Sequence, residues 1–390
     1  MQTDIIIIGS SLSAKIMALS LELNNFKVLL ISNRIGKMNP SNLVTFFSAG
    51  SIKFLNTILE NHPEIRDYES INALQCSQYE DFNKKDSILN FHNINEQLLG
   101  KIIPNKKINI LLDRKISSKQ NIKILNDVII QDIQFLETKV EVFTNQLLAI
   151  SAKLVIAADG KNSIIRNFTN IKFIKHDFKQ TAISIIADVE RKNKNIAYQF
   201  FTTDGPLALL PYQHNQSAII WSLKKYSDEL KLGQKEIEMK LNKIFKPLVN
   251  NLKIISEQRF DLSFSFAKKL FSKRVALIGD SAHSIHPIAG QGLNLIIKDI
   301  DCLSRLLKKY QSLGYDLGES IMLEEYDKIR KIDNAAYSFG TLTMDELFSS
   351  KNKYIRSLTN SVFKLFDQND TIKKHFVNSA TGSNYFNNAI

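Results

Sequence analysis

The first thirty residues alternate between a buried strand, a helix and a second buried strand. Asp4–Gly9 is a short, β-branched apolar run that ends in glycine, which is typical of a fully buried parallel strand. Ser11–Asn24 then carries leucine and isoleucine at helical spacing, and Lys27–Ile31 forms a second apolar strand. Because parallel strands are joined by a crossover helix, this βαβ unit predicts a doubly wound, Rossmann-like α/β sheet.

Later segments continue this α/β pattern. Leu154–Ala158 is a third buried-strand run and is followed by Asp159-Gly160, and Arg274–Ile278 is a fourth. The chain is expected to be helical from Gly292 onward, and the tail from Met322 is rich in helical patterns. We therefore expect the doubly wound domain to be built from separated stretches of the chain and to be followed by C-terminal helices.

The pattern changes between Thr181 and Phe266. Extended stretches in this region are separated by turn signals, of which Asp204-Gly205-Pro206 is one. Asp228–Phe245 predicts a helix that packs on these strands. We therefore expect a mainly antiparallel β-sheet to be inserted in the α/β domain as a second, substrate-binding domain.

Composition and cysteine usage narrow the class of protein. The chain has 390 residues, of which 44% are hydrophobic and 23% are charged, as in a globular domain. The aliphatic run Ile5–Ile8 is too short to cross a bilayer, and Asp4 stands where a signal peptide would be basic. Cys76 and Cys302 make no disulfide framework, so we expect a cytoplasmic protein.

The net charge is +12, and the basic residues are scattered along the chain. No basic block is interleaved with aromatic residues, so the charge does not indicate nucleic-acid binding. A diffuse basic surface is compatible with peripheral contact with an anionic membrane face. A compositional bias of the source explains the lysine content equally well.

The segment that follows the first strand resembles a dinucleotide-binding turn. Such a turn has glycine at its first, third and sixth positions, and this chain has Gly9, Ser11 and Ala14 there. Alanine is acceptable at the sixth position, whereas Ser11 places a β-carbon where a diphosphate would approach. The second strand is followed by Ser32 and Asn33 instead of an acidic residue that would hold a ribose. By itself this motif fits a plain α/β turn as well as a nucleotide site.

Two further motifs follow buried strands. In the first, Asp159-Gly160 is followed by Ser163 and Arg166 at helical spacing, which favours a cofactor-related role over an ordinary turn. The second is the longest and most specific motif of the chain, and it lies within Arg274–Ile300. It places an acidic residue at a strand end and glycines before a helix, where backbone N–H groups favour negative charge. Its candidate flavin-binding residues are Gly279, Asp280, Pro287, Gly290, Gln291, Gly292, Leu293 and Asn294.

Two histidines in the same segment do not indicate a metal site. His283 and His286 are three residues apart, and no further candidate ligand is clustered with them in the sequence. We expect them to pack or to form hydrogen bonds near the loop, and we expect no bound metal.

With these motifs in order, the chain resembles the p-hydroxybenzoate-hydroxylase-like flavoprotein monooxygenases, and within them the ubiquinone-biosynthesis hydroxylases. The resemblance covers the full length. Besides the three motifs, it depends on Trp221 and on the stretches Gly205–Pro211, His286–Leu295, Tyr326–Asp333, Asp345–Ser350 and Lys373–Gly382.

This resemblance implies FAD as the cofactor and NAD(P)H and O₂ as co-substrates. The implied reaction is hydroxylation of a polyprenylated phenol by a flavin hydroperoxide in ubiquinone biosynthesis, with other proteins of that pathway as partners. Pro287 and Gly290–Asn294 would face the isoalloxazine ring, and Asp280 would face the ribityl chain. Asp159 and Arg166 would lie near the diphosphate. No side chain is indicated as an acid–base catalyst.

The resemblance also implies a division of the chain. The FAD-binding domain is expected in three parts, over 1–68, 100–178 and 267–325. Residues 69–99 are expected to add strands to the substrate domain, whose sheet is expected over 179–266. The C-terminal helices are expected over 326–390.

Departures from the family pattern keep alternatives open. Leu43 and Val44 stand where the family has a flavin-contacting arginine, and Ile296 replaces a glycine of the helix after the flavin loop. A degenerate, non-catalytic subunit of a quinone-biosynthesis assembly is therefore the second hypothesis, and a hydroxylase of a small soluble phenol is the third. Aromatic residues of the inserted sheet either line an apolar route for the substrate tail or form ordinary core: Tyr198, Phe200, Phe201 and Trp221.

Overall fold

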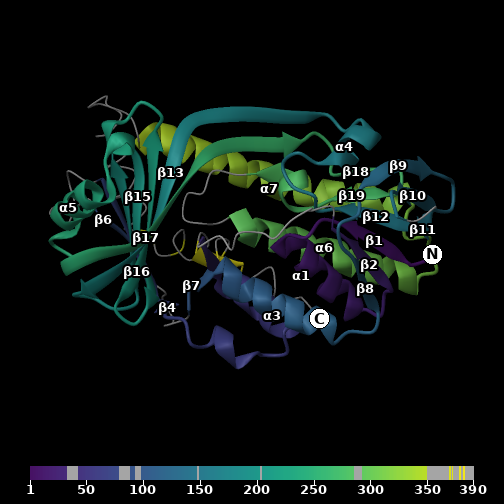
Figure 1. Ribbon diagram of the computed structural model, residues 1–390, viewed down its shortest axis with the longest axis horizontal. Coiled ribbons are helices and arrows are strands. Elements are labelled where there is room, and N and C mark those ends of the chain that lie inside the picture. The colour runs from purple at the N-terminus through teal and green to yellow at the C-terminus, as the bar shows by residue number, and fades with distance from the viewer. Residues whose placement is uncertain are drawn as a thin grey trace.

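Two packed sheet systems make up the molecule, as Figure 1 shows from the side. The computed structural model describes residues 1–32, 43–78, 88–92, 98–146, 149–202, 204–284 and 292–348, together with a few positions between 369 and 382. In Figure 1 the α/β part lies on the right and most of the inserted sheet lies on the left, from where its long strands extend over the top of the picture toward the α/β part.

The α/β part is built on a six-stranded sheet in which all strands but one edge strand pair in parallel. In spatial order its strands are β18 (Phe271–Ser272), β19 (Val275–Leu277), β12 (Leu154–Ala157), β1 (Ile5–Ile8), β2 (Val28–Ile31) and β8 (Ile122–Leu125). All four residues of β1 are isoleucines with no exposed surface. Such a strand is buried on both faces, which is how a central parallel strand is stabilised.

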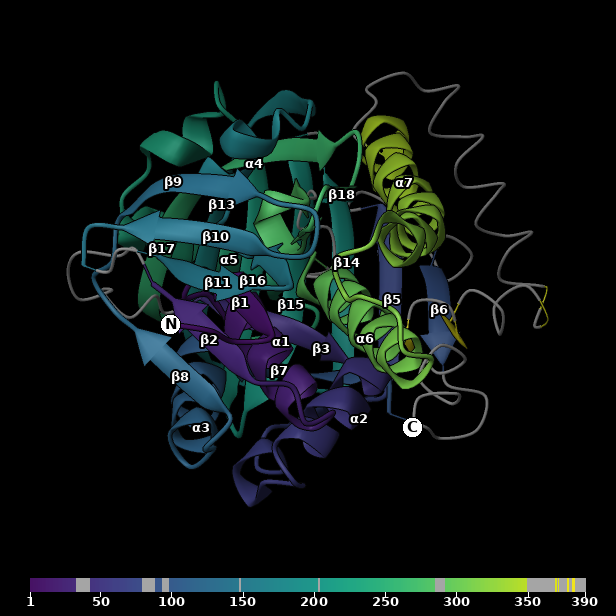
Figure 2. The same ribbon diagram turned by 90° about the vertical axis from the view of Figure 1, so that its right-hand side faces the viewer.

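Helices and a small sheet cover this central sheet. The helices are α1 (Leu12–Glu22), α2 (Ala49–Ile58), α3 (Asn105–Ser117), α4 (Ile164–Thr169), α6 (Gly292–Ser312) and α7 (Ser320–Phe348). Helix α1 contacts both α3 and α6, and α6 also contacts α7, which runs beside it in Figure 2. The small antiparallel sheet consists of β9 (Ile130–Phe135), β10 (Val140–Thr144) and β11 (Ile150–Ala152).

The inserted sheet has eight strands and is mainly antiparallel. In spatial order they are β20 (His283–Ser284), β17 (Val249–Ala267), β13 (Phe173–Arg191), β16 (Gln216–Lys224), β15 (Gly205–Gln213), β14 (Ile196–Thr202), β5 (Ala73–Gln78) and β6 (Ile88–His92). Helix α5 (Gln234–Phe245) packs on one face. A three-stranded sheet lies against the other: β3 (Val44–Ser48), β7 (Gly100–Pro104) and β4 (Ser70–Ile71).

The two faces of the inserted sheet bury different clusters. In β15, Leu207 and Leu209 pack toward α5, whereas Ala208 and Leu210 pack toward β3, β4 and β7. This is the period-two alternation of a strand that is covered on both sides. The face that carries Ala208 and Leu210 is therefore the one turned toward the α/β part.

The strands and helices expected at both ends of the α/β domain are confirmed, with small shifts of their limits. Two local predictions need adjustment. The turn predicted at Asp204-Gly205-Pro206 is present but ends earlier, because Thr202 of β14 already pairs with Gly205, the first residue of β15. The domain limits given above stay a prediction. Strand β13 runs continuously across the limit expected between residues 178 and 179.

The helix predicted over Asp228–Phe245 is wrong as a single element, because it is divided in two. A 3₁₀ turn spans Asp228–Lys231, and Leu232 and Gly233 are extended before α5 begins. The Glu236 carboxylate accepts a hydrogen bond of 2.8 Å from the Gly233 N–H, which starts the new helix.

Candidate functional site

The three motifs expected to bind the cofactor meet at one edge of the six-stranded sheet. Strands β1, β12 and β19 are neighbours and parallel, so the residues that follow their carboxyl ends lie side by side. These residues are Gly9, Asp159 and the Gly279-Asp280 pair. Ligands of doubly wound folds bind at this edge of the sheet, so the tertiary structure supports a shared site.

The turn after β1 requires glycine at its first position. Gly9 has a φ of +138°, and a β-carbon there would lie 2.2 Å from the Ala158 carbonyl oxygen. Gly279 is restricted in the same way, with a φ of +67° and the Ser13 hydroxyl 2.8 Å from the β-carbon position. Both glycines allow neighbouring loops to approach closely at the edge where the ligand is expected.

Ser11, the departure from the glycine pattern, is accommodated within the turn. Its hydroxyl forms a 2.7 Å hydrogen bond with the Ser13 hydroxyl and a 3.4 Å bond with the Ala158 carbonyl. Ser11 is also the N-cap of α1, and its side chain makes no capping hydrogen bond. The first N–H groups of α1 are therefore not capped by this side chain, as a diphosphate site at a helix N-terminus requires. Ala14 is fully buried in this first turn, where a small residue fits.

Asp159 uses one carboxylate oxygen to start α4 and leaves the other without a partner among the described residues. Oδ2 accepts hydrogen bonds from the N–H groups of Ile164 at 2.8 Å and Ile165 at 3.4 Å. Oδ1 is buried and unsatisfied by the described part of the chain. Desolvation raises the pKa of this carboxyl, against hydrogen bonds from Ser163 and the backbone. A buried acceptor of this kind fits a ligand that brings a hydroxyl or N–H group.

Arg166 donates hydrogen bonds to the backbone of two loops next to the candidate site. Its guanidinium donates to the Ser281 carbonyl at 2.6 Å and to the Lys161 carbonyl, and it lies 3.7 Å above the Phe173 ring. The residue is only 6% exposed. It therefore joins the loop after β12 to the loop after β19, and a direct contact with the cofactor stays a prediction.

Asp280 combines an exposed side chain with a desolvated carboxylate. Its side chain is exposed to solvent, yet surrounding protein desolvates the carboxylate and raises its pKa, while Lys161 and His283 oppose this shift. Exposure together with desolvation is expected for a group in a cleft rather than on a flat surface. Its carboxylate is available as an acceptor for a hydroxyl-bearing ligand.

The start of α6 is tied to β3. The Asn294 side chain accepts a 2.9 Å hydrogen bond from the Ser48 N–H and donates one of 2.8 Å to the Phe46 carbonyl. Asn294 is 2% exposed, so it positions β3 beside the first turn of α6. Gly292 and Leu293 begin the helix, and no atom of the described residues lies within 4 Å of the β-carbon position of Gly292.

Several predicted residues do not add to this geometry. Asn33, His286, Pro287, Gly290 and Gln291 lie outside the described residues. Ser32 is buried, and its backbone N–H and carbonyl bond to Leu125 and Val128. Within the described ranges, no three histidine, cysteine or carboxylate side chains are grouped as metal ligands.

A buried ionic network connects β20, α6 and α7, and the sequence motifs did not predict it. His283 lies 2.5 Å from Oδ2 of Asp299, and the Arg330 Nε donates to Oδ1 of the same carboxylate at 2.7 Å. Asn334 also donates to Oδ1, at 3.2 Å. Burial opposes ionisation of Asp299, but His283 and Arg330 outweigh it and hold its pKa below the ordinary value. A charged residue within the apolar face of α6 was the signal that the sequence offered.

Three of the four aromatic residues singled out in the inserted sheet face away from the candidate site. Tyr198, Phe200 and Trp221 are buried with Phe245 and other side chains of α5, on the far face of the sheet. Phe201 is buried in a smaller cluster with Cys76 and Phe91. Ordinary core is therefore the correct interpretation of Tyr198, Phe200 and Trp221, and the hypothesis that these three line a substrate route is wrong. Phe201 is also buried, but it lies on the same face of β14 as Ala197.

The fold and the site together define a dinucleotide-binding flavoprotein, and the residues present fit FAD. The uncapped N-terminus of α1 suits the diphosphate, and the free acceptors of Asp159 and Asp280 suit hydroxyl groups. The chain matches the FAD binding domain family over residues 106–331. It belongs to this family of FAD-dependent monooxygenases.

Named relatives agree over nearly the whole chain. The mitochondrial ubiquinone biosynthesis monooxygenase of Dictyostelium discoideum is 26% identical, covering 97% of this chain and 91% of the relative. The 3-demethoxyubiquinol 3-hydroxylase of Escherichia coli is 25% identical, covering 97% and 98%. The crystal structure of p-nitrophenol 4-monooxygenase from Pseudomonas putida has the same fold, with a TM-score of 0.79, 14% identity and coverage of 97% and 98%.

Replacing Asp280 by asparagine is expected to weaken FAD binding by about ten- to a hundredfold, because a charge-assisted hydrogen bond is lost at constant size. Titration of the apoprotein with FAD, followed by flavin fluorescence, measures this. Asp132→Asn, on the exposed surface of β9, is the matched control and should bind FAD normally. Equal affinity of the two variants would show that Asp280 does not contact the cofactor.

Proposed function

We propose that this protein hydroxylates the ring of a polyprenylated phenol in ubiquinone biosynthesis, with NAD(P)H as the reductant and O₂ as the oxidant. The observation that carries this proposal is the convergence of three cofactor motifs at one sheet edge, in a chain that matches quinone-pathway hydroxylases over nearly their full length. A bound FAD would supply the chemistry by which one oxygen atom of O₂ reaches the ring.

The residues of this chain provide position and burial. The N–H groups at the start of α1 would hold the diphosphate, and Asp280 would orient the hydroxyl-bearing chain of the cofactor. Asn294 fixes β3 against α6, so one wall of the site has a defined position. Apolar residues of β7 and β15 fill the layer between that wall and the inserted sheet. These are the conditions that flavin chemistry requires from a protein, namely orientation and exclusion of water.

The proposal is tested by quinone analysis of a deletion strain of the source organism. We expect loss of ubiquinone and accumulation of a prenylated intermediate that lacks one ring hydroxyl. A plasmid copy of the intact gene should restore the pool, whereas a Gly9→Ala copy should not. A normal ubiquinone pool with no such intermediate would contradict the proposal.

A non-catalytic family member remains the competing function. The positions that should hold the adenine end of FAD differ from the family pattern. The Ser11 hydroxyl forms its hydrogen bonds within the turn, and Ser32 replaces the acidic residue. Such a protein would be purified without stoichiometric flavin and would not support NAD(P)H oxidation. An FAD content near one per chain, together with protein-dependent NAD(P)H oxidation, excludes this alternative.

Contact with a membrane surface separates a polyprenylated substrate from a small soluble phenol. Among the helices in the described ranges, none has the length and apolar character of a membrane span. We expect the protein to sediment with anionic liposomes in low salt and to be released in high salt, as a basic surface would be. Failure of the protein to sediment with liposomes under both conditions would favour a small soluble phenol as the substrate.

A further inference from the structure

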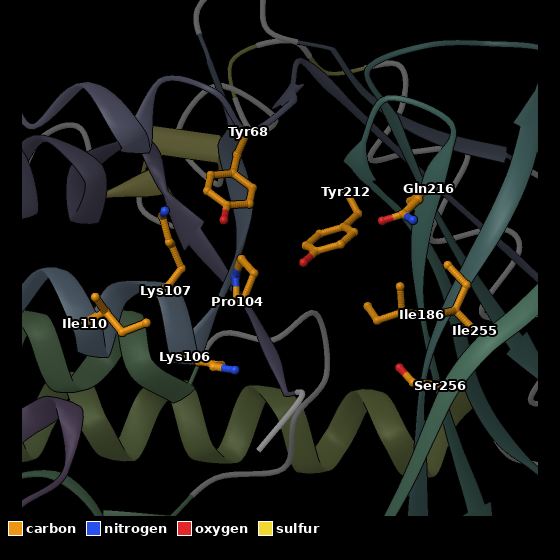
Figure 3. Close-up of a pocket in the computed structure, with 10 residues that line it drawn as sticks. All are labelled: Tyr68, Pro104, Lys106, Lys107, Ile110, Ile186, Tyr212, Gln216, Ile255 and Ser256. Atoms are coloured by element: carbon orange, nitrogen blue, oxygen red, sulfur yellow. The ribbon is translucent and has the colours of Figure 1, made fainter. Parts of the chain in front are cut away.

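A cavity of about 480 Å³ lies between α3 and the inserted sheet, apart from the residues assigned to FAD (Figure 3). Pro104 and Ile110 line it on the α3 side, and Ile186 and Ile255 line it on the sheet side. A space of this size accommodates a ring with a short side chain. The apolar lining provides a site for the body of such a ligand.

Polar groups converge on this apolar space. In Figure 3 the phenol oxygens of Tyr68 and Tyr212 and the ammonium of Lys106 point into it from different elements. Tyr68 is 6% exposed, and within the described ranges its hydroxyl has no hydrogen-bond partner. Burial raises the pKa of Tyr68 to about 12, so the phenol is a donor at neutral pH. The hydroxyl oxygen itself is not fully buried and opens onto the cavity, so a ligand there can accept its hydrogen bond.

The α3 side of the cavity is positively charged. Helix α3 is 13 residues long, has no acidic residue in its first turn and has Pro104 as an N-cap that makes no side-chain hydrogen bond. Lys106 and Lys107 lie in that first turn, where the positive end of the helix dipole already disfavours cations. Lys107 pairs with Glu64, whereas Lys106 has no ion-pair partner in the described part of the chain. Because Lys106 is exposed and has no acidic partner among these residues, its charge and the helix dipole would both attract an anion that binds there.

We propose that this cavity binds an amphipathic carboxylate of about the size of an alkylated benzoate. The carboxylate accepts hydrogen bonds from Tyr68 and Tyr212 and faces Lys106. The ring and alkyl chain contact Ile110, Ile186 and the edge of the tyrosine rings. Among the described residues the lining contains two lysines and no acidic side chain, although the Asp67 carboxylate lies close enough to act on Tyr68.

The test uses the full chain with saturating FAD and measures binding of 4-butylbenzoate by calorimetry. Its neutral partner is 4-butylbenzamide, which has nearly the same shape and no charge. Tyr68→Phe removes only the hydroxyl, and Lys106→Met removes the charge while keeping an apolar stem. Tyr226→Phe, at a tyrosine that is 73% exposed, and Lys123→Ala, on exposed β8, are the matched controls.

We expect one equivalent of 4-butylbenzoate to bind and the amide to bind at least about tenfold more weakly. Each cavity variant should lose about tenfold in affinity for the benzoate, and the controls should lose none. The proposal is overturned if the benzoate does not bind, if the amide binds equally well or if the cavity variants bind like the controls. Displacement of the probe by excess FAD would also overturn it, because the probe would then occupy the cofactor site. Binding needs no turnover, so a failure here leaves the proposed hydroxylation untouched.

Discussion

Replacing Asp299 by alanine is expected to lower the free energy of unfolding by about 3–5 kcal/mol, because it leaves a buried arginine without its carboxylate. Asp299 and Arg330 have no exposed surface, and His283 is 1% exposed. The carboxylate accepts hydrogen bonds from Arg330 and Asn334 and lies 2.5 Å from the His283 ring. In water each of these groups would be solvated, whereas in the variant they remain inside the protein.

Urea or thermal denaturation of the purified protein measures this loss. Asp333→Ala is the matched control, because Asp333 also pairs with Arg330, at 2.7 Å, but its side chain is 49% exposed. Its removal should cost clearly less than the removal of Asp299, because Asp299 still pairs with the buried Arg330 and water can reach the half-exposed position of Asp333. Similar losses in both variants would mean that the interior position of Asp299 does not govern the stability of this network.

The network also connects distant parts of the chain. His283 belongs to β20 directly after the Gly279-Asp280 loop, Asp299 to α6, and Arg330 to α7. We therefore expect Asp299→Ala to weaken FAD binding as well as folding, because the cofactor loop loses its attachment to the two helices. Asp333→Ala should bind FAD normally.

Replacing Gly9 by alanine is expected to cost about 3–5 kcal/mol of stability and to reduce FAD affinity by at least tenfold. The added β-carbon would lie 2.2 Å from the Ala158 carbonyl oxygen, and the φ of +138° is disfavoured for alanine. Neither neighbour can move freely, since the N–H groups of Gly9 and Ala158 bond to Ile31 and Ile8. Relief would require β1 and β12 to separate at the cofactor edge.

Chemical denaturation and FAD titration measure the two effects, and Gly160→Ala is the control for backbone strain. Gly160 has a φ of +86°, but no atom lies within 4 Å of its β-carbon position. Its replacement should cost only about 1–2 kcal/mol, from the left-handed conformation alone. A Gly9→Ala protein as stable as Gly160→Ala would show that the loops at this edge are not closely packed.

Much of the α/β domain was predictable because local patterns determine it. Four consecutive buried isoleucines predicted a central parallel strand, and Gly9 and Gly279 occupy positions that only glycine tolerates. The break before α5 was not predicted, because apolar spacing continues across Leu232 and Gly233 while the backbone there is extended. Nor was the ionic network, since its members are distant in sequence and meet only when α6 and α7 pack together.

The sequence by itself determined the fold class, the three cofactor motifs and the family, since each depends on the residue types and spacing within a short segment. Only the tertiary structure decided which residues form core, which hold loops together and which line a cavity. It turned Tyr198 and Trp221 toward α5 and so removed them from any substrate route. It showed that Arg166 binds the backbone of the loops after β12 and β19. It also placed Tyr68 beside Tyr212 in a cavity with a positively charged edge. Such roles depend on which distant segments approach each other in three dimensions, and local spacing carries no record of that.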